Sequence, residues 1–226
     1  MFSDDTINFL IENRINNSRE WFLANKKEYR KYVVEPMAEL VEELRPCINR
    51  IDPEIDVQSR VGKSISRINR DLRYSKDKTL YRDVIWCSFY RPRNGMYCPP
   101  GMFFELSPDG FRYGCGYYSA PSSSMKAIRE MILTDNKAFK AARAAFDRQN
   151  TFSLEGEEYK RERYSDEPDC KREWLNKKNM VFIKNSTDFA LLYSDKLGKV
   201  LTDGFYLLED IYSFLVKAEE LAACFI

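Results

Sequence analysis

The stretch RINRDLRYSKDKTLYRD, residues 67–83, gathers residue types that bind anions. Arginine recurs three times in its first seven residues, and a guanidinium grips phosphate or carboxylate through two parallel hydrogen bonds. The aspartates could orient these forks, and the tyrosine hydroxyls could add donors. The pattern therefore favours a site for a small anion. The residues that we expect to bind the anion are Arg67, Arg70, Asp71, Arg73, Lys76, Asp77, Lys78 and Tyr81.

Positive charge is concentrated in this part of the chain. Residues 60–82 hold eight Lys and Arg against two Asp, a net charge of +6, whereas the whole chain carries +1. A nearly neutral protein can therefore still present a strong local positive potential. Because the overall charge is small and recognised nucleic-acid motifs are missing from the sequence, a phosphate- or carboxylate-bearing small molecule is favoured over nucleic acid.

Two other interpretations of the segment stay open. In one, the protein is an enzyme acting on such an anion, and Asp71, Asp77, Lys78 or Tyr81 moves protons from a buried position. In the other, the aspartates pair with the arginines and the segment is a structural or protein-interaction element. Exposed ion pairs contribute about 0–1 kcal/mol each and need no function. The sequence leaves the oligomeric state undetermined.

The chain contains no histidine, which removes Ser-His-Asp and Cys-His catalysis. Its six cysteines form no C-x-x-C pair, so the spacing does not support zinc, and we expect neither metal nor cofactor. The cysteines are expected to be small buried hydrophobes. The acidic start, MFSDDTINFL, and the lack of an 18-residue apolar run predict a cytoplasmic protein without a membrane partner.

The elements that must position the segment begin with a helical part, residues 1–50. Apolar residues recur there at steps of three and four, and Pro36 is expected to kink the helix or to begin a second one. The cationic segment fits either a helical stripe or a strand, and we favour a strand or extended loop. It leads into VIWCSFY, residues 84–90, which is apolar on both faces like a central strand.

A hairpin is predicted next, with strands at 102–106 and 111–117 around a Ser-Pro-Asp-Gly turn. Its second strand contains Gly-Cys-Gly, residues 114–116, which more often marks a bulge or close strand packing than a ligand loop. The alternative is that backbone amides there approach a ligand beside the arginines. On that alternative, Gly116 and Tyr118 join the candidate anion site.

The remainder, residues 121–226, is expected to be mainly helical. Residues 150–173 are polar, and residues 155–173 are expected to form a surface excursion. A short strand lies near 180–183, and a C-terminal helix is capped by Thr202 or Asp203. With strands concentrated in 64–118, this order predicts a single α+β domain over residues 1–226. A central antiparallel or mixed sheet would pack with the N-terminal and C-terminal helices.

Three motifs are specific enough to compare with known families. Residues 67–82 follow the pattern R-I-x-R-D-x-R-F-S-x-D-K-x-P-Y-K, with departures at Tyr74, Leu80 and Arg82. GCGYYSAPSSSMKAIRE, residues 114–130, and NNSREWFLANKKEY, residues 16–29, add two more, and KRERY…EPDCKREWLNKK is weaker. These motifs resemble the uncharacterised family catalogued as domain of unknown function 2461. The resemblance implies one α+β domain and brings no established activity or catalytic residue.

Overall fold

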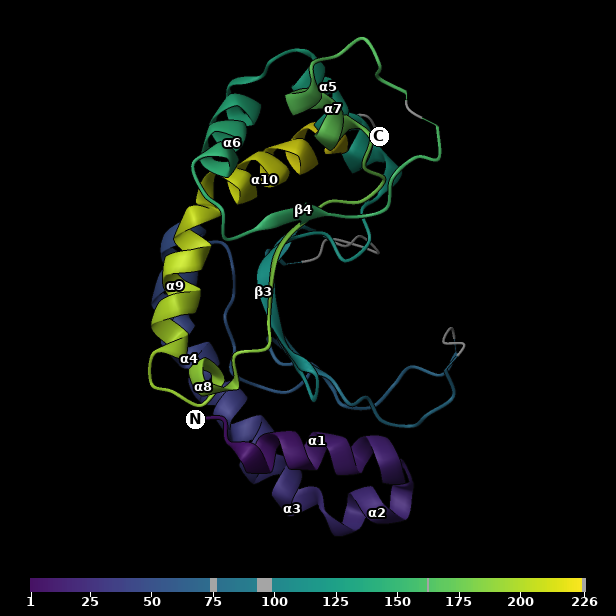
Figure 1. The fold of residues 1–226 in the computed structure, drawn as a ribbon, viewed down its shortest axis with the longest axis vertical. Coiled ribbons are helices and arrows are strands. Elements are labelled where there is room, and N and C mark those ends of the chain that lie inside the picture. Colours follow the sequence, from purple (N-terminus) through teal and green to yellow (C-terminus); the bar gives the residue numbers. More distant parts are fainter. Residues whose placement is uncertain (74–76, 93–98, 162, 225–226) are drawn as a thin grey trace. The chain divides into compact units, whose positions relative to one another are not determined.

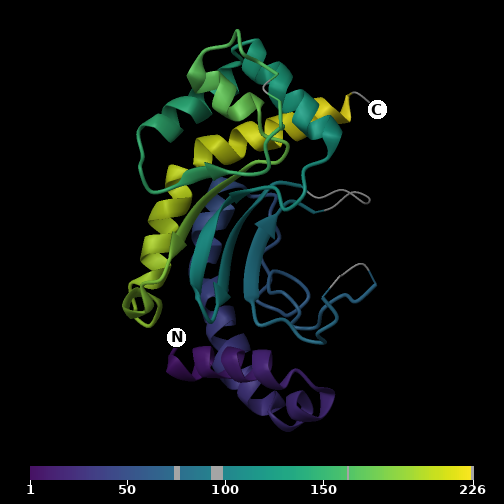
Figure 2. The same cartoon turned by 45° about the vertical axis from the view of Figure 1, so that its right-hand side comes forward.

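The computed structural model describes residues 1–73, 77–92, 99–161 and 163–224. Within these ranges, strands form a five-stranded antiparallel sheet in the order β1-β2-β3-β5-β4, and helices make up the N-terminal and C-terminal parts (Figures 1 and 2). The predicted α+β class is therefore confirmed. None of the helices in the four ranges is both long and apolar enough to cross a membrane.

Contacts divide the chain into two compact units, which are described separately. The first unit comprises residues 1–89, 103–113 and 185–202, and the second comprises residues 90–102, 114–184 and 203–226. The chain passes from one unit to the other inside five elements, so neither unit is a continuous stretch of sequence. These elements are β1 (Ile85–Tyr90), β2 (Gly101–Ser107), β3 (Gly110–Gly116), β5 (Val181–Ser186) and α9 (Leu197–Leu207). The expectation of one domain over residues 1–226 stays a prediction.

The first unit begins with a helical run, as predicted. Its members are α1 (Asp4–Asn16), α2 (Arg19–Ala24), α3 (Lys26–Glu28), the π-helix η1 (Tyr29–Val34) and α4 (Glu35–Ile51). Pro36 lies in the first turn of α4, where its missing N–H is tolerated, so it begins a helix as expected. The short helix α8 (Phe189–Leu192) completes the unit's helices in the described chain, apart from the first part of α9.

Strand β1 (Ile85–Tyr90) differs from its prediction as a central strand buried on both faces. Its side chains alternate between buried and half-buried, and it stands at one end of the strand order. The edge is nevertheless covered, because the Ser66 amide donates to the Trp86 carbonyl at 2.8 Å and the Ser88 amide donates to the Ser64 carbonyl at 2.9 Å. A covered edge strand resists pairing with other chains, which explains how an apolar strand sits there.

The second unit packs its helices around one tryptophan. Trp174 is fully buried, and four aromatic rings lie with their centroids 5.0–5.9 Å from it, those of Phe139, Phe146, Phe182 and Phe214. The rings come from α6 (Lys137–Asp147), β5 and α10 (Glu209–Ala223), and Trp174 belongs to α7 (Asp169–Leu175). Buried aromatic pairs add attraction beyond the area that they bury, so this cluster is the core of the unit.

Three other parts of the second unit test the predicted boundaries. Helix α5 (Ser122–Leu133) follows Pro121 as expected, and the strand predicted near 180–183 is β5. The polar stretch 150–173 is partly regular, because it contains β4 (Ser153–Glu155), which pairs antiparallel with β5, and the start of α7. The C-terminal prediction was wrong in its cap: Thr202 and Asp203 lie inside α9, and α10 begins separately after Leu208.

Candidate anion-binding site

The cationic segment of the first unit is extended, as expected, rather than helical. Residues 68–70 run antiparallel to residues 80–82, with the Arg70 amide donating to the Leu80 carbonyl at 2.9 Å and the Arg82 amide donating to the Ile68 carbonyl at 2.8 Å. Asn69 and Tyr81 form the bridge between them. The described residues 71–73 and 77–79 continue from the two paired arms.

Helices α1 and α2 anchor the returning arm. Asn17 exchanges two hydrogen bonds with the Tyr81 backbone, at 2.9 and 3.1 Å, and the Asn13 side chain donates to the Arg82 carbonyl at 2.8 Å. The Tyr81 ring stacks on Phe22 with centroids 4.2 Å apart and is 6 % exposed. Tyr81, which the sequence assigned to the anion site, therefore packs as a core residue of this unit.

Two of the candidate arginines are paired with the candidate aspartates. Arg73 holds Asp71 through two bonds, Nε at 3.0 Å and Nη2 at 2.8 Å. Arg70 lies 3.0 Å from Asp77 and also donates to the Thr79 hydroxyl at 3.1 Å. These pairs are the outcome that the structural interpretation of the segment required.

Two further cations are held by backbone carbonyls. Arg82 donates to the carbonyls of Arg67 and Asn69 at 3.1 and 2.7 Å, and its guanidinium lies 5.1 Å from the centre of the Trp86 ring. Lys78 donates to the Leu72 carbonyl at 3.2 Å. A carbonyl fixes a cation without cancelling its charge, so both remain sources of positive potential.

A turn at residues 60–67 carries three more cations, which are held neither by carboxylates nor by backbone carbonyls of the described residues. Among the described residues, the side chains of Arg60, Lys63 and Arg67 form no hydrogen bond or ion pair, and all three are exposed. The turn is closed by the Gly62 amide, which donates to the Ile65 carbonyl at 2.7 Å. Gly62 has φ +83°, and a Cβ there would lie 3.0 Å from Arg67 Nε. The glycine therefore leaves room for the Arg67 guanidinium against the turn.

Sequence reasoning counted Arg60 and Lys63 in the local charge but left both out of the site. The signal that could have included them is Gly62, a turn residue set between two cations. Lys76 falls outside the described residues.

Gly116 and Tyr118 belong to the second unit. A Cβ on Gly114 would lie 2.0 Å from the Phe182 carbonyl oxygen, and one on Gly116, at φ +152°, would lie 2.4 Å from that of Met180. These glycines therefore serve the close approach of β3 and β5, the first of the two interpretations offered for Gly-Cys-Gly. Tyr118 is 94 % exposed.

The segment's carboxylates have lowered pKa values. The guanidinium and the amide of Arg73 both bond to Asp71 and lower its carboxyl pKa to about 2. Bonds from the Thr79 amide and hydroxyl lower the pKa of Asp77, and Arg70 adds to the effect. A general acid at neutral pH needs a raised pKa and burial, whereas both aspartates are exposed and stay ionised.

The cysteine prediction was right for three residues and wrong for two. Cys47, Cys87 and Cys115 are buried, and burial raises the pKa of the Cys87 thiol to about 12. Cys170 and Cys224 are exposed, and Cys98 lies outside the described residues. Throughout the described ranges, no group of three or more His, Cys, Asp and Glu side chains is arranged to hold a metal ion.

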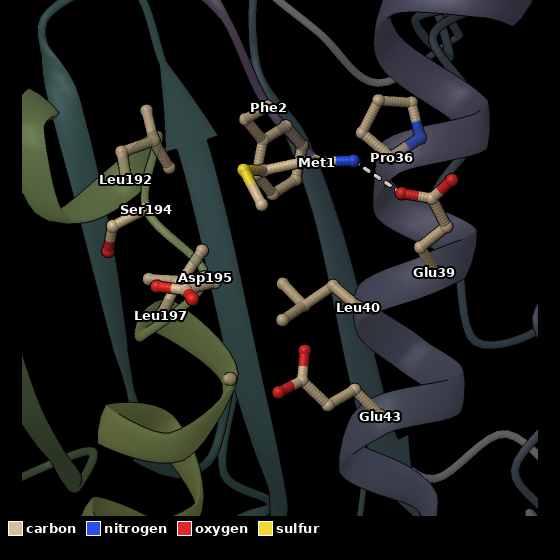
Figure 3. Close-up of a pocket in the computed structure, with 11 residues that line it drawn as sticks. Met1, Phe2, Pro36, Glu39, Leu40, Glu43, Leu192, Ser194, Asp195 and Leu197 are labelled. Carbon is tan, nitrogen blue, oxygen red and sulfur yellow. Dashed lines mark hydrogen bonds and ion pairs between the residues drawn. The ribbon is translucent and has the colours of Figure 1, made fainter.

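A separate pocket of about 190 Å³ opens in the first unit between α4 and residues 192–198 (Figure 3). Its wall includes Leu40, and its rim carries Glu39, Glu43 and Asp195 (Figure 3). The Met1 ammonium pairs with Glu39. Three carboxylates against one cation make this rim acidic, so its charge disfavours an anionic ligand.

The fold and the segment together define an α+β protein with a cationic loop that is partly neutralised by its own aspartates. Comparison with protein families matches residues 5–214 to the family of conserved hypothetical proteins DUF2461, and the chain belongs to this family. The match covers nearly the whole chain and confirms the resemblance carried by the three motifs. A comparison with curated proteins found no significant match.

Proposed function

We propose that this protein binds a small phosphate- or carboxylate-bearing anion through residues 60–82, with Arg67 as the first ligand. The supporting observation is the state of the segment's cations. Of its described Lys and Arg side chains, only Arg70 and Arg73 have a carboxylate partner. The turn at residues 60–67 contributes three cations without any partner among the described residues. An anion arriving there displaces only water.

The paired arginines have a secondary part in this proposal. Both ion pairs are at the surface, where such pairs contribute about 0–1 kcal/mol each. A phosphate group forms charge-assisted bonds at least as strong as those of a carboxylate, so it can compete with Asp71 for Arg73. The aspartates therefore hold the guanidinium groups in defined positions until the ligand arrives.

The proposed setting is the cytoplasm, and the proposed ligand is a free small molecule. Nucleic acid is the less favoured partner, because the chain carries only +1 overall. An enzymatic role draws no support from Asp71 and Asp77, whose lowered pKa values keep them ionised.

The test is a calorimetric titration of the whole protein with phosphate, citrate, a nucleoside triphosphate and short DNA, each at 50 and 200 mM NaCl. We expect at least one small anion to bind, and to bind more weakly at the higher salt because screening shortens the reach of exposed charges. The variant Lys63→Gln/Arg67→Gln should weaken that binding at least about tenfold, since each charge-assisted bond contributes about 1.5–3 kcal/mol.

The matched control is Lys26→Gln/Lys27→Gln, which removes the same charge from the exposed surface of α3. It should change affinity less than twofold. No binding at 50 mM NaCl, or equal losses in the two double variants, would rule out the proposed site.

The second candidate is a structural role, and the pairs Arg70–Asp77 and Arg73–Asp71 favour it. In that case the segment closes its own loop and exposes a stable surface to a partner protein. Arg70→Ala should then lower the melting temperature, whereas Arg67→Ala should leave it unchanged.

A further inference from the structure

A second basic region lies in the second unit, in the stretch that the sequence marked only as a polar excursion. A pocket of about 620 Å³ is lined there by Tyr159, Lys160, Arg161, Arg163 and Lys178. Four of the five lining side chains are cations, and none is a carboxylate. A concave surface with one sign of charge concentrates its field, so this lining attracts anions.

The tyrosine at the centre of the lining organises the cations. The Arg163 guanidinium carbon lies 3.7 Å from the centre of the Tyr159 ring, and the Lys178 ammonium lies 5.7 Å from it. Arg129, from α5, lies 5.2 Å from the same point. The face of an aromatic ring attracts cations through its quadrupole. The ring therefore holds three cations near one another without neutralising them.

The backbone beneath the pocket is well supported. The Tyr159 amide donates to the Asn176 carbonyl at 3.1 Å, and the Lys178 amide donates to the Glu157 carbonyl at 2.6 Å. Arg129 donates to the Lys177 carbonyl at 2.7 Å. These bonds tie residues 157–159 to residues 176–178, so Lys178 projects from a fixed scaffold. The Arg163 amide is tied to the same scaffold, because it donates to the Asn176 side chain at 3.4 Å.

Carboxylates compete little for these cations. Glu157 lies 3.8 Å from the Lys178 ammonium. In the part of the chain that the structure describes, Lys160, Arg161 and Arg163 have no carboxylate partner. Glu158 pairs with the buried Lys177, which does not line the pocket. Within the described residues, no carboxylate therefore cancels the charge of these three lining cations.

We infer that this pocket binds a compact anion carrying two or more phosphate groups. Four cations around one concavity match a ligand with several negative charges better than a single phosphate. The close approach of Arg163 occupies a face of Tyr159, whereas proteins that bind single-stranded nucleic acid stack bases on open aromatic faces. Charge rather than base stacking is therefore the basis of recognition. The site shares no residue with the one proposed above and does not depend on it.

The test is calorimetry of the whole protein with inorganic diphosphate and triphosphate at 50 mM NaCl. Phosphate and a single-stranded oligonucleotide serve as comparison ligands. We expect diphosphate or triphosphate to bind at least tenfold more tightly than phosphate, and more weakly at 200 mM NaCl. Tighter binding of the oligonucleotide than of triphosphate, through the same residues, would overturn the assignment to a compact ligand.

The variant Lys160→Gln/Arg161→Gln removes two lining charges from exposed side chains and should weaken triphosphate binding at least about tenfold. The matched control, Lys140→Gln/Lys184→Gln, removes equal charge from exposed positions of α6 and β5 and should change affinity less than twofold. Equal losses in both variants, or no triphosphate binding at 50 mM NaCl, would refute the pocket. If Lys63→Gln/Arg67→Gln alone abolishes triphosphate binding, the ligand belongs to the first unit and the inference fails.

The role of the ring has its own pair of variants. Tyr159→Phe keeps the aromatic face and should bind triphosphate within about twofold of the parent, because the cation–ring contacts persist. Tyr159→Leu keeps the bulk but loses the face, so its affinity should fall severalfold although every charge remains. Equal affinities of the two variants would contradict a ring that positions the cations.

Discussion

The cationic segment of the first unit and the Tyr159 pocket of the second unit are built from the same residue types, arginine, lysine and tyrosine. They differ in what holds the cations. In the segment, aspartates hold Arg70 and Arg73, and backbone carbonyls hold Arg82. In the pocket, an aromatic ring holds Arg163. A carboxylate fixes a guanidinium by cancelling its charge, whereas a ring or a carbonyl fixes it and leaves the charge available.

The two regions differ in the number of their cations and in how many of those cations have a carboxylate partner. The segment has the larger number, with eight cations in residues 60–82. The pocket draws its lining from residues 159–161, from Arg163 and from Lys178, which follows the residue bridged to Glu158. Folding therefore adds one cation, Lys178, to three that are already close together in the sequence.

The two tyrosines give the prediction with the largest effect. Tyr81→Ala should lower the free energy of unfolding by about 3 kcal/mol, because it removes a buried ring stacked on Phe22 and leaves a cavity. Tyr159 is half-buried, so Tyr159→Leu should cost no more than about 1 kcal/mol. Urea denaturation of both variants measures the difference. Equal losses would remove the distinction between a core tyrosine and one that positions cations.

The sequence predicted the local features of the fold but not those that depend on contacts between distant residues. The hairpin, the helix after Pro121 and the helix begun by Pro36 are local features set by turn residues and apolar periodicity, and each was found. The edge position of β1 depends on which strands are neighbours and on the cover from residues 64–66, and no local pattern carries that information.

The candidate site was harder to predict than the fold. The extended form of the segment was expected, and the Asp71–Arg73 pair was one of the open alternatives. The burial of Tyr81 was missed, because it depends on α1 and α2 folding back more than 50 residues along the chain. The Tyr159 pocket was missed for a similar reason, since Lys178 joins its lining and Arg129 approaches the Tyr159 ring from α5.

A smaller difference in stability is expected between substitutions of two arginines of the segment. Arg70→Ala should destabilise the protein by about 1 kcal/mol, since it breaks an ion pair and a bond to Thr79 at a side chain that is only 22 % exposed. Arg67→Ala should stay within about 0.5 kcal/mol of the parent, because its head has no partner among the described residues. Thermal melts of the two variants, with Lys26→Ala as a control, measure both effects. A larger loss for Arg67→Ala would reverse the roles assigned here to the two arginines.

The smallest predicted effect is the pH dependence of stability that arises from the lowered pKa of Asp71. Bonds from Arg73 lower this pKa to about 2 in the folded protein, below the ordinary value near 3.8. A group with a lowered folded pKa contributes its stability above the unfolded pKa and loses it as the pH falls through the folded value. The contribution is therefore complete at neutral pH and declines between about pH 4 and pH 2.

Because Asp71 is exposed, the change in stability is too small to isolate by denaturation, and the carboxyl carbon should be followed by NMR instead. We expect a midpoint near 2 in the parent and a return toward the ordinary pKa in Arg73→Gln, which removes the charge and the bidentate bond. Asp109, whose pKa is lowered by Arg14 instead, should be unchanged in that variant and serves as the internal control. An ordinary midpoint for Asp71 in the parent would mean that Arg73 is not neutralised in solution. The segment would then resemble the Tyr159 pocket in offering free cations, and the contrast between the two regions would disappear.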